Sequence, residues 1–342
     1  MSKSLTPSRR QFMLGSAAGT AMATASFATA AAQPIAQSAT ESAKAPDLSG
    51  LSVLITGCSS GFGRLSAEYF ARLGAKVFAT MRNMPRPEAD ELTQFAAENA
   101  LDLHIIEIDV TLDDQVTKGV AAALEKTGGT LDVLVNNAGI STSGPIELQD
   151  MEATKLLFET NVFGPQRLAR AALPAMRAAK SGLIFNVTSQ LGRVMIPGFG
   201  QYSPTKFALE AMSEQMAYEL APHGIEVTII QPGGYPTKIW ENQAPLSGAL
   251  KARAPEEVLA AYPQLTARMG ASGGGGGSTD PMDIPRAMAE IISMPAGMRP
   301  LRRAVHPGSK PQVPINEVSA KQQLAFLGES AYGPWIKAVL NP

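Results

Sequence analysis

The chain has 342 residues, of which 45% are hydrophobic and 17% charged, and its formal net charge is −1. This composition suits a globular protein with a sizeable core and excludes a chain that is disordered throughout. Because basic residues are not in excess, the sequence gives no indication of nucleic-acid binding.

The first 32 residues have the order of a secretory leader. Lys3, Arg9 and Arg10 occur without any acid, a run of mainly small residues follows from Leu14 to Ala31, and three alanines precede Gln33. The paired arginines resemble a twin-arginine (Tat) signal. The run is diluted by Thr, Ser and Gly, so we expect no stable membrane anchor.

We therefore predict a signal peptide at 1–32, a linker at 33–50 and an exported, periplasmic protein. Loss of the leader would leave 26 basic against 30 acidic side chains. The alternative is a cytoplasmic protein whose N-terminal tail carries the arginine pair by chance.

After residue 50, short apolar runs rich in β-forming residues alternate with segments of helical period. The expected strands are 51–56, 76–80, 103–108, 133–135, 183–187, 226–230 and 303–306. The expected helices include 64–73, 113–126, 152–180, 204–221 and 283–294. This alternation predicts an α/β fold in which a mostly parallel, doubly wound sheet carries helices on both faces.

A glycine motif, TGCSSGFG from Thr56 to Gly63, follows the first expected strand and opens a helix. Gly57 can form a tight turn, Gly61 lets the backbone approach a pyrophosphate, and Gly63 permits close helix packing. The helix N-terminus offers free N–H groups and a partial positive charge to phosphates. The motif predicts a dinucleotide site, and a purely structural glycine turn is the alternative.

The residue at the end of the second expected strand indicates which dinucleotide binds. Arg82 stands 19 residues beyond Gly63, and the first acid after it is Glu88. A basic residue here suits a ribose 2′-phosphate, whereas an acid would suit a 2′-hydroxyl. We predict NADP, with NAD as the alternative, and Arg82 and Ser60 as phosphate contacts. A solvated surface role for Arg82 stays open.

Cysteine and histidine offer little chemistry in this chain. The single cysteine, Cys58, cannot form an intramolecular disulfide and is expected to be a small packed thiol. His104, His223 and His306 fit no metal-ligand spacing, so we expect no metal site.

Tyr202 and Lys206 stand at i and i+4, so they share one helix face, and Pro204 between them fits only a first turn. The lysine and the helix N-terminus predict a lowered pKa for the phenol, which could then exchange a proton with an alcohol or carbonyl. Ser189 ends a strand 13 residues earlier and could hydrogen-bond the substrate oxygen. Asn161 lies inside a long expected helix.

These motifs together resemble the short-chain dehydrogenase/reductase (SDR) family over a domain from 51 to 306. The family's NNAG motif appears at 136–139, its Pro-Gly segment at 232–237, and Asp109 matches the acid that contacts adenine. Its Asn-Ser-Tyr-Lys tetrad falls on Asn161, Ser189, Tyr202 and Lys206.

The resemblance implies a Rossmann fold of about seven strands and hydride transfer between nicotinamide and a carbinol or carbonyl carbon. Tyr202 would be the general acid/base, Lys206 would hold the nicotinamide ribose, Ser189 would position the substrate oxygen, and Asn161 would support a water. Two alternatives remain open: a non-catalytic NADP-binding protein, and an SDR-type isomerase that recycles its cofactor. The residues expected to bind cofactor are Gly57, Ser59, Ser60, Gly61, Phe62, Gly63, Arg82, Asp109, Val110, Asn137, Ala138, Gly139, Tyr202, Lys206, Pro232, Gly233 and Thr237.

Regularity fades after Thr237, and a polyglycine run lies within 270–278. We predict a substrate lid at about 234–282 that includes a mobile loop, and a C-terminal extension at 307–342. Tyr235, Trp240, Leu246 and Leu250 favour a bulky apolar substrate, with packing of the lid itself as the alternative. The resemblance also implies a homodimer or homotetramer.

Overall fold

A computed structural model of the chain describes residues 46–273 and 275–340. The predicted signal peptide and residues 33–45 of the predicted linker lie outside these residues. Among the described residues, no helix combines the length and apolar character needed to cross a bilayer.

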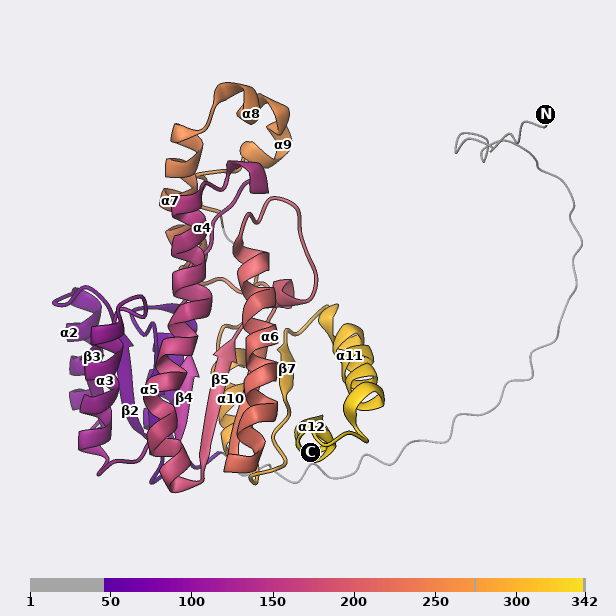
Figure 1. Cartoon of the computed structure of the whole chain (residues 1–342). Helices are drawn as coiled ribbons and strands as arrows, with labels where there is room; N and C mark the ends of the chain where they lie inside the picture. Colours follow the sequence, from indigo (N-terminus) through magenta and orange to yellow (C-terminus); the bar gives the residue numbers. More distant parts are fainter. Residues whose placement is uncertain (1–45, 274, 341–342) are drawn as a thin grey trace, which may run out of the picture. The chain divides into compact units, whose positions relative to one another are not determined.

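In the described part of the chain, seven parallel strands form one sheet in the order β3-β2-β1-β4-β5-β6-β7 (Figure 1). The bounds agree closely with the predicted runs, and the doubly wound parallel sheet is confirmed. The strands are β1 (Ser52–Ile55), β2 (Lys76–Met81), β3 (Leu103–Glu107), β4 (Val133–Asn136), β5 (Gly182–Val187), β6 (Ile225–Pro232) and β7 (Arg302–Val305).

Helices connect the strands and extend beyond the sheet. The α-helices are α1 (Gly61–Arg72), α2 (Pro87–Glu98), α3 (Asp113–Lys126), α4 (Met151–Phe158), α5 (Gly164–Ala179), α6 (Tyr202–Leu220), α7 (Ile239–Arg253), α8 (Glu256–Ala261), α9 (Pro263–Thr266), α10 (Asp283–Ile292), α11 (Gln312–Leu327) and α12 (Gly333–Leu340). Short turns are the 3₁₀ segments η1 (Ile146–Leu148), η3 (Gln190–Gly192) and η4 (Ala221–His223) and the π-helical segment η2 (Glu159–Phe163).

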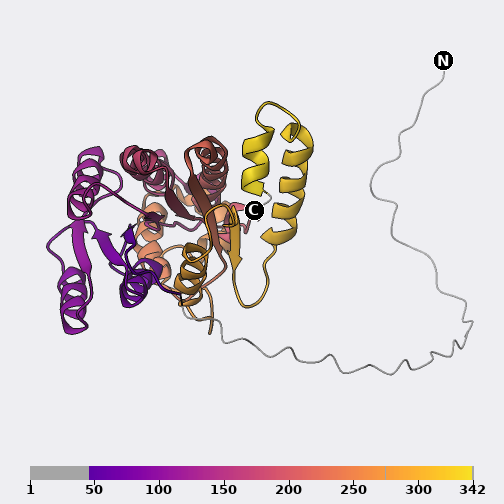
Figure 2. The same ribbon diagram turned by 90° about the horizontal axis from the view of Figure 1, so that it is seen from below.

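The sheet separates two hydrophobic cores. One face packs against α1, α2 and α10, and the other against α3, α5 and α6. Figure 2 shows these helices on both sides of the strands. Because both faces are covered, every residue of β1 and β4 is buried, which explains why these strands are apolar without alternation.

The strand order reverses direction between β1 and β4. The chain proceeds outward from β1 to β2 and β3, then returns to β4 on the other side of β1. At such a reversal the loops that follow the two strands diverge, which opens a crevice at the carboxyl ends of the strands. The predicted glycine motif follows β1 and the NNAG motif follows β4, so both lie at this crevice.

The segment 238–281 is more regular than predicted. Helices α7, α8 and α9 occupy most of it and lie beyond the carboxyl end of the sheet (Figure 1). Pro255 and Pro263 stand at helix starts, where proline is tolerated, so they begin helices rather than prevent them. Leu250 packs in a small core with Leu148, Ala153 and Met269. These helices thus give regular structure to a segment in which the sequence pattern had faded.

The single predicted helix 152–180 is interrupted. The π-helical segment η2 separates α4 from α5, and such a turn holds one residue more than an α-helical turn would. The helical period of the sequence continues across the insertion, so the pattern alone did not reveal it.

The C-terminal extension folds onto the edge of the sheet. Helices α11 and α12 contact each other, α12 also packs on α6, and α11 packs on β7. They stand as a pair at that edge in Figure 2.

Candidate active site

A pocket of about 730 Å³ lies at the carboxyl ends of the strands. The structure brings nearly all predicted site residues to its wall, although they come from segments spread between positions 57 and 237. Of the predicted catalytic and cofactor-binding residues, Gly63 and Asn161 do not line it.

The glycine loop packs closely against the segment that follows β4. Gly57 has a φ of +74°, and a Cβ there would lie 2.9 Å from the Cα of Ala138. At Gly63 a Cβ would lie 2.3 Å from the carbonyl oxygen of Gly57. Gly63 is therefore needed for helix packing, as predicted, and the first residues of α1, Gly61 and Phe62, line the pocket.

Two side chains under this loop fasten it to the neighbouring strand. Thr56, 1% exposed, accepts hydrogen bonds at Oγ1 from the backbone N–H groups of Asn137 and Ala138, each 3.0 Å long. Asn137 Nδ2 donates to the carbonyl oxygen of Thr56 at 2.9 Å. The Asn137 side chain thus supports the loop, and Thr56 is a positioning residue that the sequence analysis did not single out.

Cys58 within the loop is completely buried, as predicted for a packed thiol. Its Sγ lies 3.2 Å from the carbonyl oxygen of Ile55. Burial raises the pKa of the thiol to about 12, because the charged thiolate would lose its hydration.

The ends of β2 and β3 supply charged groups at one end of the pocket. Arg82 Nη1 lies 3.8 Å from Asp109 Oδ2, and the Asp109 side chain also accepts hydrogen bonds from Thr111. Arg86 lines the same region, although its guanidinium is held by Glu88 with two contacts of 2.9 Å. Arg82 is therefore the less constrained cation facing this part of the pocket.

Ser189, Tyr202 and Lys206 converge at the end of β5. Tyr202 is the first residue of α6, so Pro204 falls in the first turn as predicted. Lys206 is 4% exposed; its Nζ donates to the carbonyl oxygen of Val187 at 2.9 Å and lies 5.5 Å from the centre of the Tyr202 ring. The Ser189 hydroxyl is hydrogen-bonded to the Tyr202 phenol.

The predicted fall in the tyrosine pKa is wrong for this structure. Burial raises the pKa of Tyr202 to about 12, and the hydrogen bond from Ser189 offsets only part of that rise. Burial also lowers the pKa of Lys206 to about 8, while the negative charge of Glu210 acts to raise it. The physical reason is that both groups are enclosed, and Lys206 Nζ donates to a backbone carbonyl of β5.

Asn161 lies in the π-helical segment and is fully buried. Its Oδ1 accepts from the N–H of Ile140 and its Nδ2 donates to the carbonyl oxygen of the same residue, both at 2.9 Å. Nδ2 also lies 3.0 Å from Thr205 Oγ1 on α6. A Cβ on Gly139 would sit 3.3 Å from Asn161 Oδ1, so a side chain there would require Asn161 to shift by a few tenths of an ångström. Asn161 joins the loop after β4 to the helix that carries Tyr202.

Aromatic and aliphatic side chains enclose the other end of the pocket. Tyr235, Trp240 and Leu246 line it, and so does Phe199, whose ring centre lies 6.2 Å from that of Trp240. Leu250 does not line it, because it packs in the small core under α7. Two buried hydroxyls on the pocket wall, Ser141 and Thr160, have no hydrogen-bond partner among the described residues, and neither was singled out from the sequence.

The sheet, its glycine loop and the Ser-Tyr-Lys group define a Rossmann-fold protein with a dinucleotide-binding crevice. The chain belongs to the short chain dehydrogenase family, whose model matches residues 52–246. A short-chain dehydrogenase from Streptomyces avermitilis has a similar solved structure, with a TM-score of 0.61, 31% identity, and coverage of 81% of this chain and 96% of that one.

Two curated relatives carry names of oxidoreductases. The 3-ketodihydrosphingosine reductase of Bacteroides thetaiotaomicron is 36% identical over 191 residues, which are 56% of this chain and 66% of the relative. The mitochondrial D-beta-hydroxybutyrate dehydrogenase of Mus musculus is 36% identical over 201 residues, 57% of each chain. The chain thus aligns with 57 to 66% of the length of these relatives.

The fold is also shared with a Burkholderia phymatum short chain dehydrogenase/reductase solved in complex with NAD. The two structures align with a TM-score of 0.64 at 24% identity, over 82% of this chain and 95% of the Burkholderia phymatum chain. A metagenomic short-chain oxidoreductase solved with NADP has a TM-score of 0.60 at 24% identity, covering 77% of this chain and 99% of that one.

Proposed function

We propose that the chain is an NADP(H)-dependent oxidoreductase that interconverts an alcohol and a ketone or aldehyde. The observation that carries the proposal is the convergence of Ser189, Tyr202 and Lys206 in the same pocket as the glycine loop. Family membership and the names of the relatives support an oxidoreductase.

The pocket residues fit a dinucleotide. The loop from Gly57 to Gly61 has positive φ angles at both glycines and offers backbone N–H groups at the start of α1, a combination suited to a pyrophosphate. Asp109 and Val110 would lie beside the adenine, and Lys206 beside the nicotinamide ribose. Bound NADP(H) would supply or accept the hydride.

The chain's own residues would transfer the proton and hydrogen-bond the substrate oxygen. In the reducing direction the Tyr202 phenol donates its proton to the carbonyl oxygen, and the Ser189 hydroxyl donates a hydrogen bond to the same oxygen. A pKa of about 12 keeps the phenol protonated and ready to donate at neutral pH. In the oxidising direction Tyr202 must first ionise, which the cation of Lys206 favours.

Hydride transfer should be measured with purified protein over a panel of ketones, aldehydes and alcohols. We expect Tyr202→Phe to lose nearly all turnover, while Tyr218→Phe on the same helix, outside the pocket wall, keeps it. Equal activity of Tyr202→Phe and wild type would refute the role of Tyr202. Tight nucleotide binding without turnover would favour a binding protein, and product without net NADPH consumption would favour an isomerase.

We infer NADP rather than NAD from the end of β2. Arg82 faces the pocket there, and Ser60 lines it on the neighbouring loop. We expect Arg82→Asp to weaken NADPH binding more than tenfold and NADH binding much less, because a carboxylate would repel the 2′-phosphate. An unchanged preference between the two nucleotides would exclude Arg82 from the phosphate site.

We propose a substrate with a bulky apolar body. Phe199, Trp240 and Leu246 support this, because all three line the pocket and the Phe199 ring contacts the rings of Tyr202 and Trp240. The panel should include 3-oxo and 3-hydroxy compounds of increasing chain length, since two relatives are named for a 3-keto and a beta-hydroxy substrate. Short polar carbonyls turned over better than long apolar ones would contradict this proposal.

We propose that residues 1–32 direct export through a Tat-type route as a folded protein with NADP already bound. Replacing both Arg9 and Arg10 with lysine should then keep the protein in the cytoplasm, as measured by cell fractionation. An unchanged location of the double variant would refute the leader's role.

We also propose a homodimer or homotetramer. Exposed apolar side chains on and beside α4, namely Met151, Leu156 and Phe163, support a contact there. Light scattering on the purified protein would test this, and a monomer at micromolar concentration would contradict it.

A further inference from the structure

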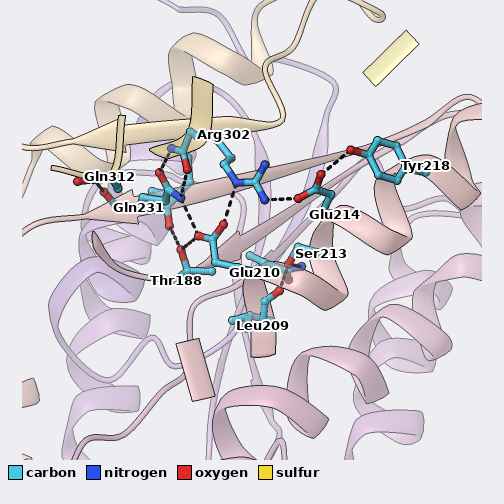
Figure 3. A network of polar contacts seen from close by, with 12 residues as sticks. Thr188, Leu209, Glu210, Ser213, Glu214, Tyr218, Gln231, Arg302 and Gln312 are labelled. Carbon is cyan, nitrogen blue, oxygen red and sulfur yellow. Dashed lines mark hydrogen bonds and ion pairs between the residues drawn. The ribbon is translucent and has the colours of Figure 1, made fainter. Parts of the chain in front are cut away.

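A buried carboxylate lies one helical turn beyond Lys206. Glu210 on α6 is 2% exposed, and its two oxygens accept hydrogen bonds from three different elements (Figure 3). Thr188 Oγ1 donates to Oε1 at 2.7 Å, Gln231 Nε2 donates to the same oxygen at 2.8 Å, and Arg302 Nε donates to Oε2 at 2.9 Å. Arg302 supplies the positive charge that pairs with this buried carboxylate.

The partners of Glu210 lie beside the proposed catalytic group. Thr188 immediately precedes Ser189 at the end of β5, and Lys206 precedes Glu210 by one turn of α6. The Glu210 carboxylate therefore ties the helix of Tyr202 and Lys206 to the strand end of Ser189. A Cβ on Gly192, in the turn after Ser189, would come within 3.0 Å of Glu210 Cγ, which shows how closely this turn packs against the carboxylate's side chain.

The C-terminal extension completes the network. Asn316 on α11 donates from Nδ2 to Gln231 Oε1 at 2.7 Å. Gln312, also on α11, donates to the backbone carbonyl of Gln231 at 3.3 Å. With its oxygen occupied by Asn316, the Gln231 amide directs its NH₂ group toward Glu210.

Resting on the proposed function, we propose that Glu210 is a positioning residue of the active site. Its carboxylate fixes Ser189 and the Tyr202–Lys206 face of α6 in one geometry, and Arg302, Gln231 and α11 hold that carboxylate in place. Loss of its charge therefore lowers turnover more than nucleotide affinity, because the glycine loop and Arg82 are not part of the network.

The charge of Glu210 also acts on Lys206. The charged groups around Glu210 are Lys206 and Glu214 on α6, Arg302 on β7, and Arg193 at the end of η3. Lys206 also faces the Tyr202 ring on its own helix, whose centre lies 5.5 Å from Nζ. Burial favours the neutral form of Lys206, and the carboxylate favours the charged form, so removal of that charge should let the lysine lose its proton at lower pH.

Glu214 provides a matched control. It lies one further turn along α6, pairs with the same Arg302 and accepts a hydrogen bond from Tyr218, but it contacts neither Thr188 nor Gln231 among the described residues. If the network served stability alone, Glu210→Gln and Glu214→Gln would have similar effects on turnover.

The experiment compares kcat, KM, the nucleotide Kd and the pH profile of carbonyl reduction in these two variants. We expect Glu210→Gln to lower kcat about tenfold, with nucleotide Kd within about twofold of wild type. We expect the alkaline limit of its activity to move down by about half to one pH unit. Glu214→Gln should keep kcat within about twofold and leave the pH profile unchanged.

A kcat and pH profile for Glu210→Gln equal to those of Glu214→Gln would overturn the inference, provided that the wild type is active. A wild type that transfers no hydride would instead contradict the proposed function, and the inference with it. If Glu210→Gln does not fold, Thr188→Val should lower kcat about fivefold relative to Thr188→Ser, which keeps the donor. Equal turnover of these two variants would also overturn the inference.

Discussion

Replacement of Thr56 by valine tests how the cofactor loop is held. Valine has nearly the shape of threonine, so the substitution removes the hydroxyl with little change in packing. In the wild type that hydroxyl accepts from the N–H of Ala138 at 3.0 Å, and the described residues offer this N–H no second acceptor. The N–H of Asn137 loses one of two acceptors, because it also lies 3.1 Å from the carbonyl oxygen of Val135.

The expected cost follows from these contacts. One part-buried N–H left without a partner costs up to about 1–3 kcal/mol, and a weakened second bond adds about 0.5–1 kcal/mol. We therefore expect Thr56→Val to lower the free energy of unfolding by about 2–4 kcal/mol. Thr56→Ser keeps the acceptor and loses a buried methyl group, which should cost about 1 kcal/mol.

Urea denaturation with fluorescence detection would give the free energies of unfolding of both variants. Titration with NADPH would show whether the glycine loop still binds the nucleotide. Nucleotide affinity should fall in Thr56→Val and remain close to wild type in Thr56→Ser. A difference in unfolding free energy below about 0.5 kcal/mol between the two variants would refute this account of the loop.

The remaining predictions concern the lid and the buried lysine. Gly276→Ala should destabilise the protein by more than about 2 kcal/mol, because Gly276 has a φ of +108° and a Cβ there would lie 2.4 Å from the backbone carbon of Tyr235. Gly273→Ala, where a Cβ would meet nothing within 4 Å, is the control, and equal melting curves would contradict the prediction. Lys206→Met should abolish turnover yet raise the unfolding free energy at about pH 7 by about 1–3 kcal/mol, since folding no longer buries a charge. The pKa of Lys206 is about 8 in the folded protein and 10.5 in the unfolded chain, so between these pH values only the unfolded wild type keeps the proton. The free energy of unfolding of the wild type therefore rises with pH in this range, and the advantage of Lys206→Met over the wild type should shrink. An advantage that grows with pH would contradict this reasoning.

Local signals accounted for most of what the sequence predicted correctly. The strands were recognisable because both faces of the sheet are covered, which leaves uninterrupted apolar runs such as 52–55 and 133–136. Tyr202 and Lys206 were recognisable because their spacing places them on one helix face. Ser189 followed from its position at a strand end.

Features that depend on distant contacts were not predictable in this way. Glu210 and Arg302 are 92 positions apart, and no local pattern indicates that they meet. The rise in the pKa of Tyr202 likewise comes from burial by surrounding elements and not from its neighbours in sequence. The π-helical segment was not predicted, because a one-residue insertion leaves the apolar period of the long helix almost unchanged.

The burial of Cys58 gives this chain an internal reporter of local opening. A thiol-specific reagent can reach this side chain only when the turn after β1 separates from its neighbours, so the rate of modification measures how often that happens. A ligand seated on the same turn would slow the reaction in proportion to its occupancy. Since the sequence contains a single cysteine, the signal arises from this one turn.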